Sequence, residues 1–205
     1  MEPDAVEIRV LGSLIEKQRT TPDVYPLTLN ALRLACNQST NRDPVVDYDE
    51  NTIRSGIERL VQRKWATLAS WSNRRSMKYR QTLDSALGLD DGEISLLAVL
   101  MLRGPQTPGE LKTRTERLHR FGDMAELTAA LERLIERGRV ANLGKQPGQR
   151  EERYTQLLSD PADEISLEEG PPVADTGAED RIDRIERQLA ELRAEIRSLR
   201  EELGA

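Results

Sequence analysis

The segment IERLVQRKWATL, at residues 57–68, occurs a second time in degenerate form as LERLIERGRVAN, at residues 131–142. The two segments match apolar with apolar at three positions, and three charged residues are identical in both. In each, leucine, isoleucine and valine recur at the spacing of a helix that buries one face, and a short alternating stretch follows. The chain therefore contains a helix that leads into a strand twice, 74 residues apart.

Each copy of this segment ends a longer run of elements in the same order. In the first copy, apolar residues recur at helical spacing in three places before two short alternating stretches around a polar turn. In the second copy, helices are expected at residues 92–103, 108–119 and 124–137, before strands at 139–144 and 150–158. Three helices followed by a hairpin is the order of a winged helix-turn-helix domain. The sequence therefore predicts an α+β fold, mainly α with small β-hairpins, that consists of two tandem winged helix-turn-helix domains at residues 1–85 and 86–158.

A further match pairs TTPDVYPLTLNAL, at residues 20–32, with QTPGELKTRTERL, at residues 106–118. The offset is here 86 residues rather than 74, so the first copy contains twelve extra residues. This alignment places Thr21 opposite Thr107, and it places the extra residues around 37–48.

The segment LRGPQTPGELKTRTERLHRF, at residues 102–121, contains the only histidine of the chain. Thr107, Pro108 and Glu110 have the spacing of a capped helix start, and a Gly-Pro step ends the helix before it. His119 then falls near the end of the second helix, without a cysteine or another histidine at metal-ligand spacing and without a nucleophile tied to it. We expect a turn and a helix start here, and neither a catalytic nor a metal site.

The formal charge of −6 is unevenly distributed. Residues 1–160 carry 24 lysines and arginines against 23 aspartates and glutamates, whereas residues 161–205 carry six against thirteen. The acidity belongs to the tail, so it does not exclude nucleic acid as a partner of the body of the chain. Within the body, residues 51–83 carry eight bases against one acid, Glu58.

This basic window covers the third helix and the hairpin of the first copy, with which a winged helix enters the major groove and holds the adjoining phosphates. Side chains at the start of that helix are placed to read base edges, and those of the hairpin to meet phosphate. A solvated basic face without a ligand is the alternative interpretation. The predicted DNA-binding residues are Asn51, Arg54, Ser55, Arg59, Arg74, Arg75, Lys78 and Arg80.

The last part of the chain has a different character. Residues 159–179 hold seven acids, no base, three prolines and two glycines, which predicts an acidic flexible linker. Residues 180–205 repeat apolar side chains in steps of three and four, which predicts a coiled-coil helix and a homodimer, with a single amphipathic helix folded onto its own domain as the alternative. The seam consists of Ile182, Ile185, Leu189, Leu192, Ile196, Leu199 and Leu203.

The single cysteine, Cys36, cannot form an internal disulfide, which is consistent with a reducing compartment. The first residues lack the basic region and apolar core of a secretion signal, and the longest apolar run, at 96–102, is far below the roughly 20 residues that span a bilayer. We expect a soluble cytoplasmic protein with no membrane contact and no cofactor.

Three stretches resemble the signature sequences of the YceH-like family of uncharacterised bacterial proteins: residues 11–45, residues 102–121, and PGQREERY at 147–154. The resemblance implies a tandem winged-helix fold and assigns no biochemical activity. The first of these stretches contains a polar cluster. Hydrogen bonding to the backbone in a tight turn explains the cluster more simply than catalysis does, and the cluster stays a candidate for a binding role. This cluster consists of Asn37, Gln38, Asn41 and Arg42.

Together these features predict a non-enzymatic winged-helix protein that binds double-stranded DNA in a regulatory or architectural role. The alternative is a protein–protein interaction scaffold that uses its paired winged helices without binding DNA. An enzyme is disfavoured because the sequence contains no recognisable constellation of nucleophile, base or metal ligands.

Overall fold

The structure is a computed structural model, and it describes residues 2–69, 77–145 and 151–159. All of these residues belong to one compact unit, Met1–Ile165. Helices dominate this part of the chain, and its strands form two small antiparallel sheets. The expected α+β fold class, mainly α with small β-hairpins, is therefore confirmed.

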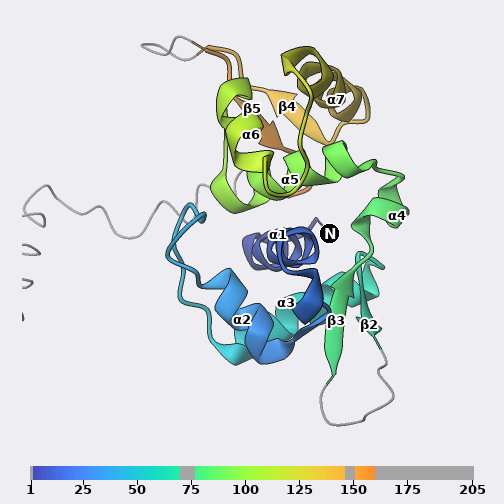
Figure 1. The fold of residues 1–205 in the computed structure, drawn as a ribbon. Coiled ribbons are helices and arrows are strands. Elements are labelled where there is room, and N and C mark those ends of the chain that lie inside the picture. The colour runs from blue at the N-terminus through green and yellow to red at the C-terminus, as the bar shows by residue number, and fades with distance from the viewer. Residues whose placement is uncertain (1, 70–76, 146–150, 160–205) are drawn as a thin grey trace, which may run out of the picture. The chain divides into compact units, whose positions relative to one another are not determined.

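The first half of the unit combines three helices with a three-stranded sheet (Figure 1). A strand that the sequence did not indicate, β1, lies between the first two helices and pairs with β3, so the sheet order is β1-β3-β2. Tyr79 of β3 is flanked by Leu27 of β1 and Leu68 of β2. The elements are α1 (Ala5–Thr20), the 3-10 helix η1 (Pro22–Val24), β1 (Leu27–Thr28), α2 (Leu29–Cys36), α3 (Glu50–Gln62), β2 (Ala66–Ala69) and β3 (Lys78–Gln81).

The second half repeats this order after a short connecting helix, α4 (Leu83–Leu87). The position of β1 is taken by Gln106, whose backbone N–H and C=O bond to Tyr154 of β5 at 3.0 and 2.8 Å. The elements are α5 (Asp91–Arg103), α6 (Pro108–Thr115), α7 (Met124–Glu136), β4 (Val140–Asn142) and β5 (Tyr154–Gln156).

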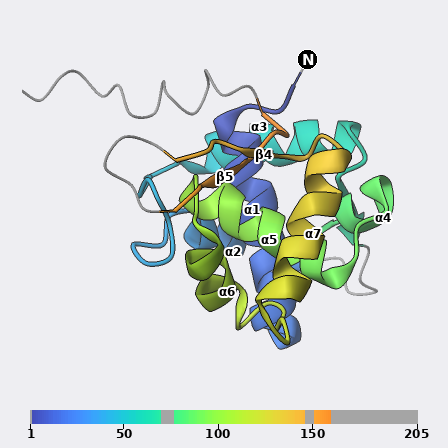
Figure 2. The ribbon, with the colours of Figure 1, turned by 90° about the horizontal axis from the view of Figure 1, so that it is seen from above.

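The two halves meet where α1 packs against α5 (Figure 1). Every residue from Gly92 to Leu102 is buried, because α5 lies between the two halves and, apart from Glu93 and Ser95, carries no polar side chain along this stretch. The two helices pack tightly at Gly12, where an added Cβ would lie 3.0 Å from both Met101 Cβ and Leu102 Cγ. Seen from above, α5 lies over α1, with α6 and α7 on either side of it (Figure 2). The core is thus continuous between the halves.

A buried carboxylate joins the first helix of each half to the third. In the first half, Glu7 is 2% exposed and forms a capping box with Asp4 at the start of α1. Its two oxygens also accept hydrogen bonds from Arg59 Nε at 3.0 Å and Arg63 Nε at 2.9 Å. Those arginines belong to the segment that first revealed the repeat.

The second half has the same arrangement around Glu93, which is 1% exposed. Glu93 forms a capping box with Asp90 and accepts from Arg133 Nε at 2.8 Å and Arg137 Nη1 at 3.3 Å. Two of the three charged residues that are identical in the segments 57–68 and 131–142 are therefore the arginines that hold the third helix of each half to the first.

Two expectations about the second helices are wrong. The helix expected at 108–119 ends at Thr115, whose hydroxyl donates to the backbone carbonyl of Leu111, so His119 lies in the following turn. There its ring meets Phe121 edge-on, with centroids 4.7 Å apart. The expected capped start at Thr107, in contrast, is confirmed by a complete capping box with Glu110.

The pairing of Thr21 with Thr107 is also wrong. The residue that caps α2 is Thr28, whose hydroxyl accepts from the backbone N–H of Ala31 at 3.3 Å. The extra residues of the first copy are therefore divided between two places. One group, which includes η1, precedes α2, and the other lengthens the loop between α2 and α3. Local Thr-Pro similarity misaligned the copies because two different turns use the same dipeptide.

Candidate nucleic-acid interface

The third helix of the first half, α3, begins at the N-cap Asp49, whose carboxylate accepts from the backbone N–H of Thr52 at 2.7 Å. Ile53, Ile57 and Leu60 are fully buried, as their helical spacing predicts. The opposite face is exposed, and its side chains are Asn51, Arg54, Ser55 and Glu58. Three of the predicted DNA-binding residues therefore share one accessible face.

Arg54 is not alone on this face. Its Nη2 lies 2.6 Å from Glu50 Oε1, in an ion pair whose side chains are 44% and 53% exposed. Exposed pairs one helical turn apart contribute about 0.3–0.5 kcal/mol, so a phosphate or a base edge can displace Glu50. The sequence window that began at residue 51 excluded this acid, although its position one turn before Arg54 was a readable signal.

Arg59, another predicted DNA-binding residue, has a different role. Its Nη2 lies 2.5 Å from Asp4 and its Nε bonds to the buried Glu7. Arg63 is held by the same glutamate. We assign Arg59 to the junction of α1 and α3, because its departure would remove one of the two arginines that compensate the buried carboxylate of Glu7.

The hairpin contributes cations from its described strands. Arg80 of β3 is exposed, and Lys78 lies half-buried at the other end of that strand, paired with Ala69 of β2. Lys64 is exposed at the turn between α3 and β2. The predicted phosphate contacts Arg74 and Arg75 lie outside the described residues.

The equivalent helix of the second half, α7, has a different surface. At the positions that correspond to Asn51, Arg54 and Ser55, 74 residues later, it carries Ala125, Thr128 and Ala129. The rest of its exposed face is acidic or apolar, with Glu126, Glu132, Ile135 and Glu136. At these three positions, therefore, only the first half presents an amide and a guanidinium group from its third helix.

The polar cluster of the long loop between α2 and α3 mainly closes that loop. Asn37 Nδ2 donates to the backbone carbonyl of Tyr48 at 2.8 Å, and its Oδ1 accepts from the Tyr48 N–H at 3.0 Å. Arg42 is buried and donates to the backbone carbonyl of Ala35 at 2.9 Å and to Glu16 of α1 at 2.6 Å. These bonds agree with the expected backbone bonding in a turn. The other two members, Gln38 and Asn41, face a cleft between this loop and α1.

Glu16 receives a bidentate contact, because both terminal nitrogens of Arg42 bond to its two oxygens. Burial raises the pKa of Glu16, but the hydrogen bonds and charge of Arg42 outweigh it and hold the pKa below its ordinary value. The pair therefore stays ionised and fastens the loop to α1.

Comparison with known proteins identifies the family. The family described as "Protein of unknown function, DUF480" matches residues 4–149. A UPF0502 protein of Pelobacter propionicus is 46% identical over 201 residues, which cover 95% of this chain and 91% of the relative. The UPF0502 protein YceH of Salmonella paratyphi B is 41% identical over 211 residues, 99% of this chain and 98% of the relative.

The chain belongs to the DUF480 family. The resemblance to YceH-like proteins is thereby confirmed, and it extends beyond the three stretches that suggested it. The description of this family names no activity.

The one cysteine of this DUF480 protein lies in the core. Cys36 is fully buried, and burial raises the pKa of its thiol to about 11, so it packs as a small apolar residue. No group of three histidines, cysteines or acids suited to a metal ion occurs in the ranges 2–69, 77–145 and 151–159. Within the same ranges, no helix is long and apolar enough to cross a membrane.

Proposed function

We propose that this protein is a non-enzymatic winged-helix protein that binds double-stranded DNA through α3 and the β2–β3 hairpin of its first half. The observation that carries the proposal is the sheet order β1-β3-β2, with β1 between the first two helices and with α3 leading directly into the hairpin. In a winged helix this order places the third helix against the major groove and the hairpin beside the adjoining backbone.

The polar and basic side chains proposed to contact DNA divide into two roles. Asn51, Arg54 and Ser55 carry the donors and acceptors that read base edges. Lys78 and Arg80 would meet phosphate oxygens, together with Arg74 and Arg75. Binding to bases requires Arg54 to leave Glu50.

The acids on α3 limit the strength of this contact. Glu50 and Glu58 are both exposed on the helix and repel phosphate. We therefore expect the hairpin cations to supply most of the affinity. Four phosphate contacts would give a slope of log affinity against log salt of about −3.6, at about −0.9 for each contact.

The test is fluorescence anisotropy of a labelled duplex across a salt series. Lys78→Ala with Arg80→Ala is expected to weaken binding and to flatten the slope by about 1.8. Arg120→Ala is the matched control, because this exposed arginine pairs only with Glu116, four residues before it, among the described residues. No binding of the wild type at low salt, or an equal loss in the control, would reject the proposal.

A second candidate function, a protein-interaction scaffold, is favoured by the exposed face of α7. Met124 is 39% exposed and Ile135 is 37% exposed, and small residues lie between them. This face suits a protein better than DNA because its charges are acidic. The test is co-purification of a partner protein with the wild type and with Ile135→Glu. The scaffold is favoured if the variant loses a partner that the wild type retains, and if neither protein binds DNA.

The homodimer belongs to the same proposal. All seven residues of the heptad seam, between 182 and 203, lie outside the described residues. A dimer would present two copies of α3, and paired half-sites on DNA suit such a two-fold arrangement.

A further inference from the structure

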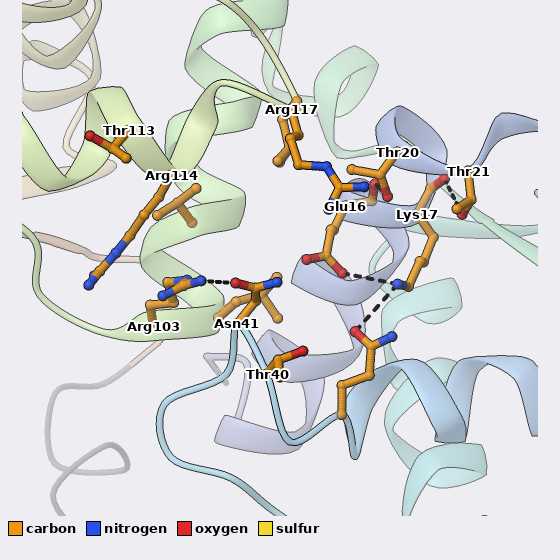
Figure 3. Close-up of a pocket in the computed structure, with 14 residues that line it drawn as sticks. Glu16, Lys17, Thr20, Thr21, Thr40, Asn41, Arg103, Thr113, Arg114 and Arg117 are labelled. Carbon is orange, nitrogen blue, oxygen red and sulfur yellow. Dashed lines mark hydrogen bonds and ion pairs between the residues drawn. The ribbon is translucent and has the colours of Figure 1, made fainter.

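A cleft of about 460 Å³ is lined by residues that lie outside α3 and outside the hairpin strands β2 and β3. It is enclosed by the C-terminal ends of α1 and α5, by α6 with the turn after it, and by the loop between α2 and α3 (Figure 3). Its volume falls within the range of about 300–1,000 Å³ that is typical of small-molecule sites. Segments far apart in the sequence thus converge on one space.

The charged lining of the cleft is mostly basic. Four cations contribute to it, and they come from three different segments: Lys17, Arg103, Arg114 and Arg117. Of the described residues, Glu16 is the one carboxylate in the lining; it pairs with Arg42 behind the wall, and one of its oxygens also lies 3.5 Å from Lys17 Nζ. The cleft is therefore an electropositive pocket with its own acid neutralised.

Several of these donors are not used within the protein. Among the described residues, Arg117 has no hydrogen-bond or ion-pair partner, and Figure 3 shows its side chain extending toward Glu16 and Thr20 of α1. The guanidinium of Arg103 carries five N–H donors, and one of them donates to Asn41 Oδ1. Both arginines therefore retain donors for a ligand.

The arginines also lie close enough to disfavour one another. Burial, followed by the positive charges of Arg114 and Arg42, lowers the pKa of Arg103. The carboxylates of Glu16 and Asp43 act in the opposite direction and do not cancel this effect. An anion in the cleft would relieve the repulsion between these guanidinium groups.

The neutral part of the lining adds polar partners and a small apolar wall. Gln38 accepts from Lys17 Nζ at 3.3 Å, which holds the lysine at the cleft, and Asn41 holds Arg103. Asn41 has a φ of 61°, a conformation that asparagine tolerates better than most residues. Val99, Leu102 and Leu118 line the remaining side and leave room for an organic part of a ligand.

We propose that this cleft binds a small ligand that carries a phosphoryl group. Arginine pairs bind phosphoryl oxygens through parallel N–H donors, and a nearby lysine adds a point charge. Arg103 and Arg117 are the principal contacts, Lys17 and Arg114 complete the positive lining, and Gln38 and Asn41 position two of these cations. This gives the polar loop cluster a role in binding.

Isothermal titration with inorganic pyrophosphate, in the absence of DNA, tests the proposal. The full chain is expected to bind saturably, and Arg103→Gln with Arg117→Gln is expected to weaken binding at least about tenfold, since each lost charge-assisted contact costs more than a neutral one. Arg120→Gln is the control, because this arginine lies three residues from Arg117 and does not line the cleft. Arg117→Gln alone removes an exposed side chain with no described partner, so it reports on binding even if the double variant fails to fold.

Absence of saturable binding by the wild type, or equal binding by the double variant, overturns the proposal. A second titration with duplex DNA separates the two sources of phosphate. If the double variant loses DNA binding while pyrophosphate gives no saturable signal in the wild type, the cleft holds DNA backbone and the small-ligand proposal is wrong. Because the pyrophosphate titration contains no DNA, it can succeed or fail independently of the proposed DNA-binding function.

Discussion

Glu93→Gln is expected to destabilise the protein far more than Glu116→Gln, although both changes remove one carboxylate from an arginine pair. Glu93 is 1% exposed and accepts hydrogen bonds from the backbone N–H of Asp90 and from two arginines. The substituted amide keeps the shape of the side chain, loses its charge, and turns an N–H₂ group toward a guanidinium.

The magnitude follows from these contacts. The side chains of Arg133 and Arg137 are 43% and 45% exposed, so water screens them, and each pair contributes about 0.5–1 kcal/mol rather than the value of a buried pair. A buried donor left without an acceptor costs about 1 kcal/mol more. We expect a loss of about 2–3 kcal/mol in the free energy of unfolding, which corresponds to a fall of about 5–10 °C in Tm for a chain of this size.

The control pair is fully on the surface. Glu116 and Arg120 lie 3.2 Å apart with side chains 54% and 82% exposed. Its loss is expected to change the free energy of unfolding by less than about 0.5 kcal/mol. Urea titration followed by circular dichroism measures both variants, and Glu7→Gln is expected to reproduce the larger effect in the first half. Equal destabilisation by Glu93→Gln and Glu116→Gln would refute the argument.

Four further outcomes are expected. Glu16→Gln should lower stability at pH 7 and should make stability fall less on acidification. The reason is that the depressed pKa of Glu16 stabilises the fold at pH values above the ordinary pKa of 4.5, and this stabilisation is lost as the pH falls through the pKa of the folded state. Urea titrations between pH 3 and 7 measure the difference from wild type. Gly12→Ala should lower Tm, because its Cβ would meet the backbone-proximal atoms of α5 at 3.0 Å; an unchanged Tm would contradict the close packing of α1 and α5. Gly138→Ala should cost about 1 kcal/mol in urea titration through its φ of 64° alone, since nothing lies within 4 Å of the added atom. Ile196→Lys should abolish self-association in sedimentation, and an unchanged mass would reject the predicted coiled coil.

Much of the fold could be predicted from the sequence because the duplicated segment carries its information locally. The apolar spacing of Ile53, Ile57 and Leu60 identified the buried face of α3, and the capping residues Thr107 and Glu110 located the start of α6. What periodicity could not supply was β1, which is two residues long and exists only because a distant strand pairs with it.

The candidate site was harder to predict because charge counts ignore partners. Arg59 looked available for DNA, yet it pairs with Asp4 and Glu7, which lie more than 50 residues away. A signal was present, since Asp-x-x-Glu occurs at the start of the first helix of each half, at residues 4–7 and 90–93, and the arginine is repeated with it. When an acid and a base both recur in the two copies of a repeat, an ion pair within the fold is a better prediction than a ligand site.

The most direct test of the central claim compares equivalent positions of the two halves. Ser55 of α3 and Ala129 of α7 are both exposed and lie 74 residues apart, at the same place in the duplicated helix. Ser55→Cys and Ala129→Cys, each labelled with a photoreactive group, are mixed with duplex DNA and irradiated, while the native Cys36 stays buried. Crosslinking to DNA is predicted from position 55 and not from position 129. Equal crosslinking from both positions, or none from position 55, would contradict the assignment of DNA binding to the first half.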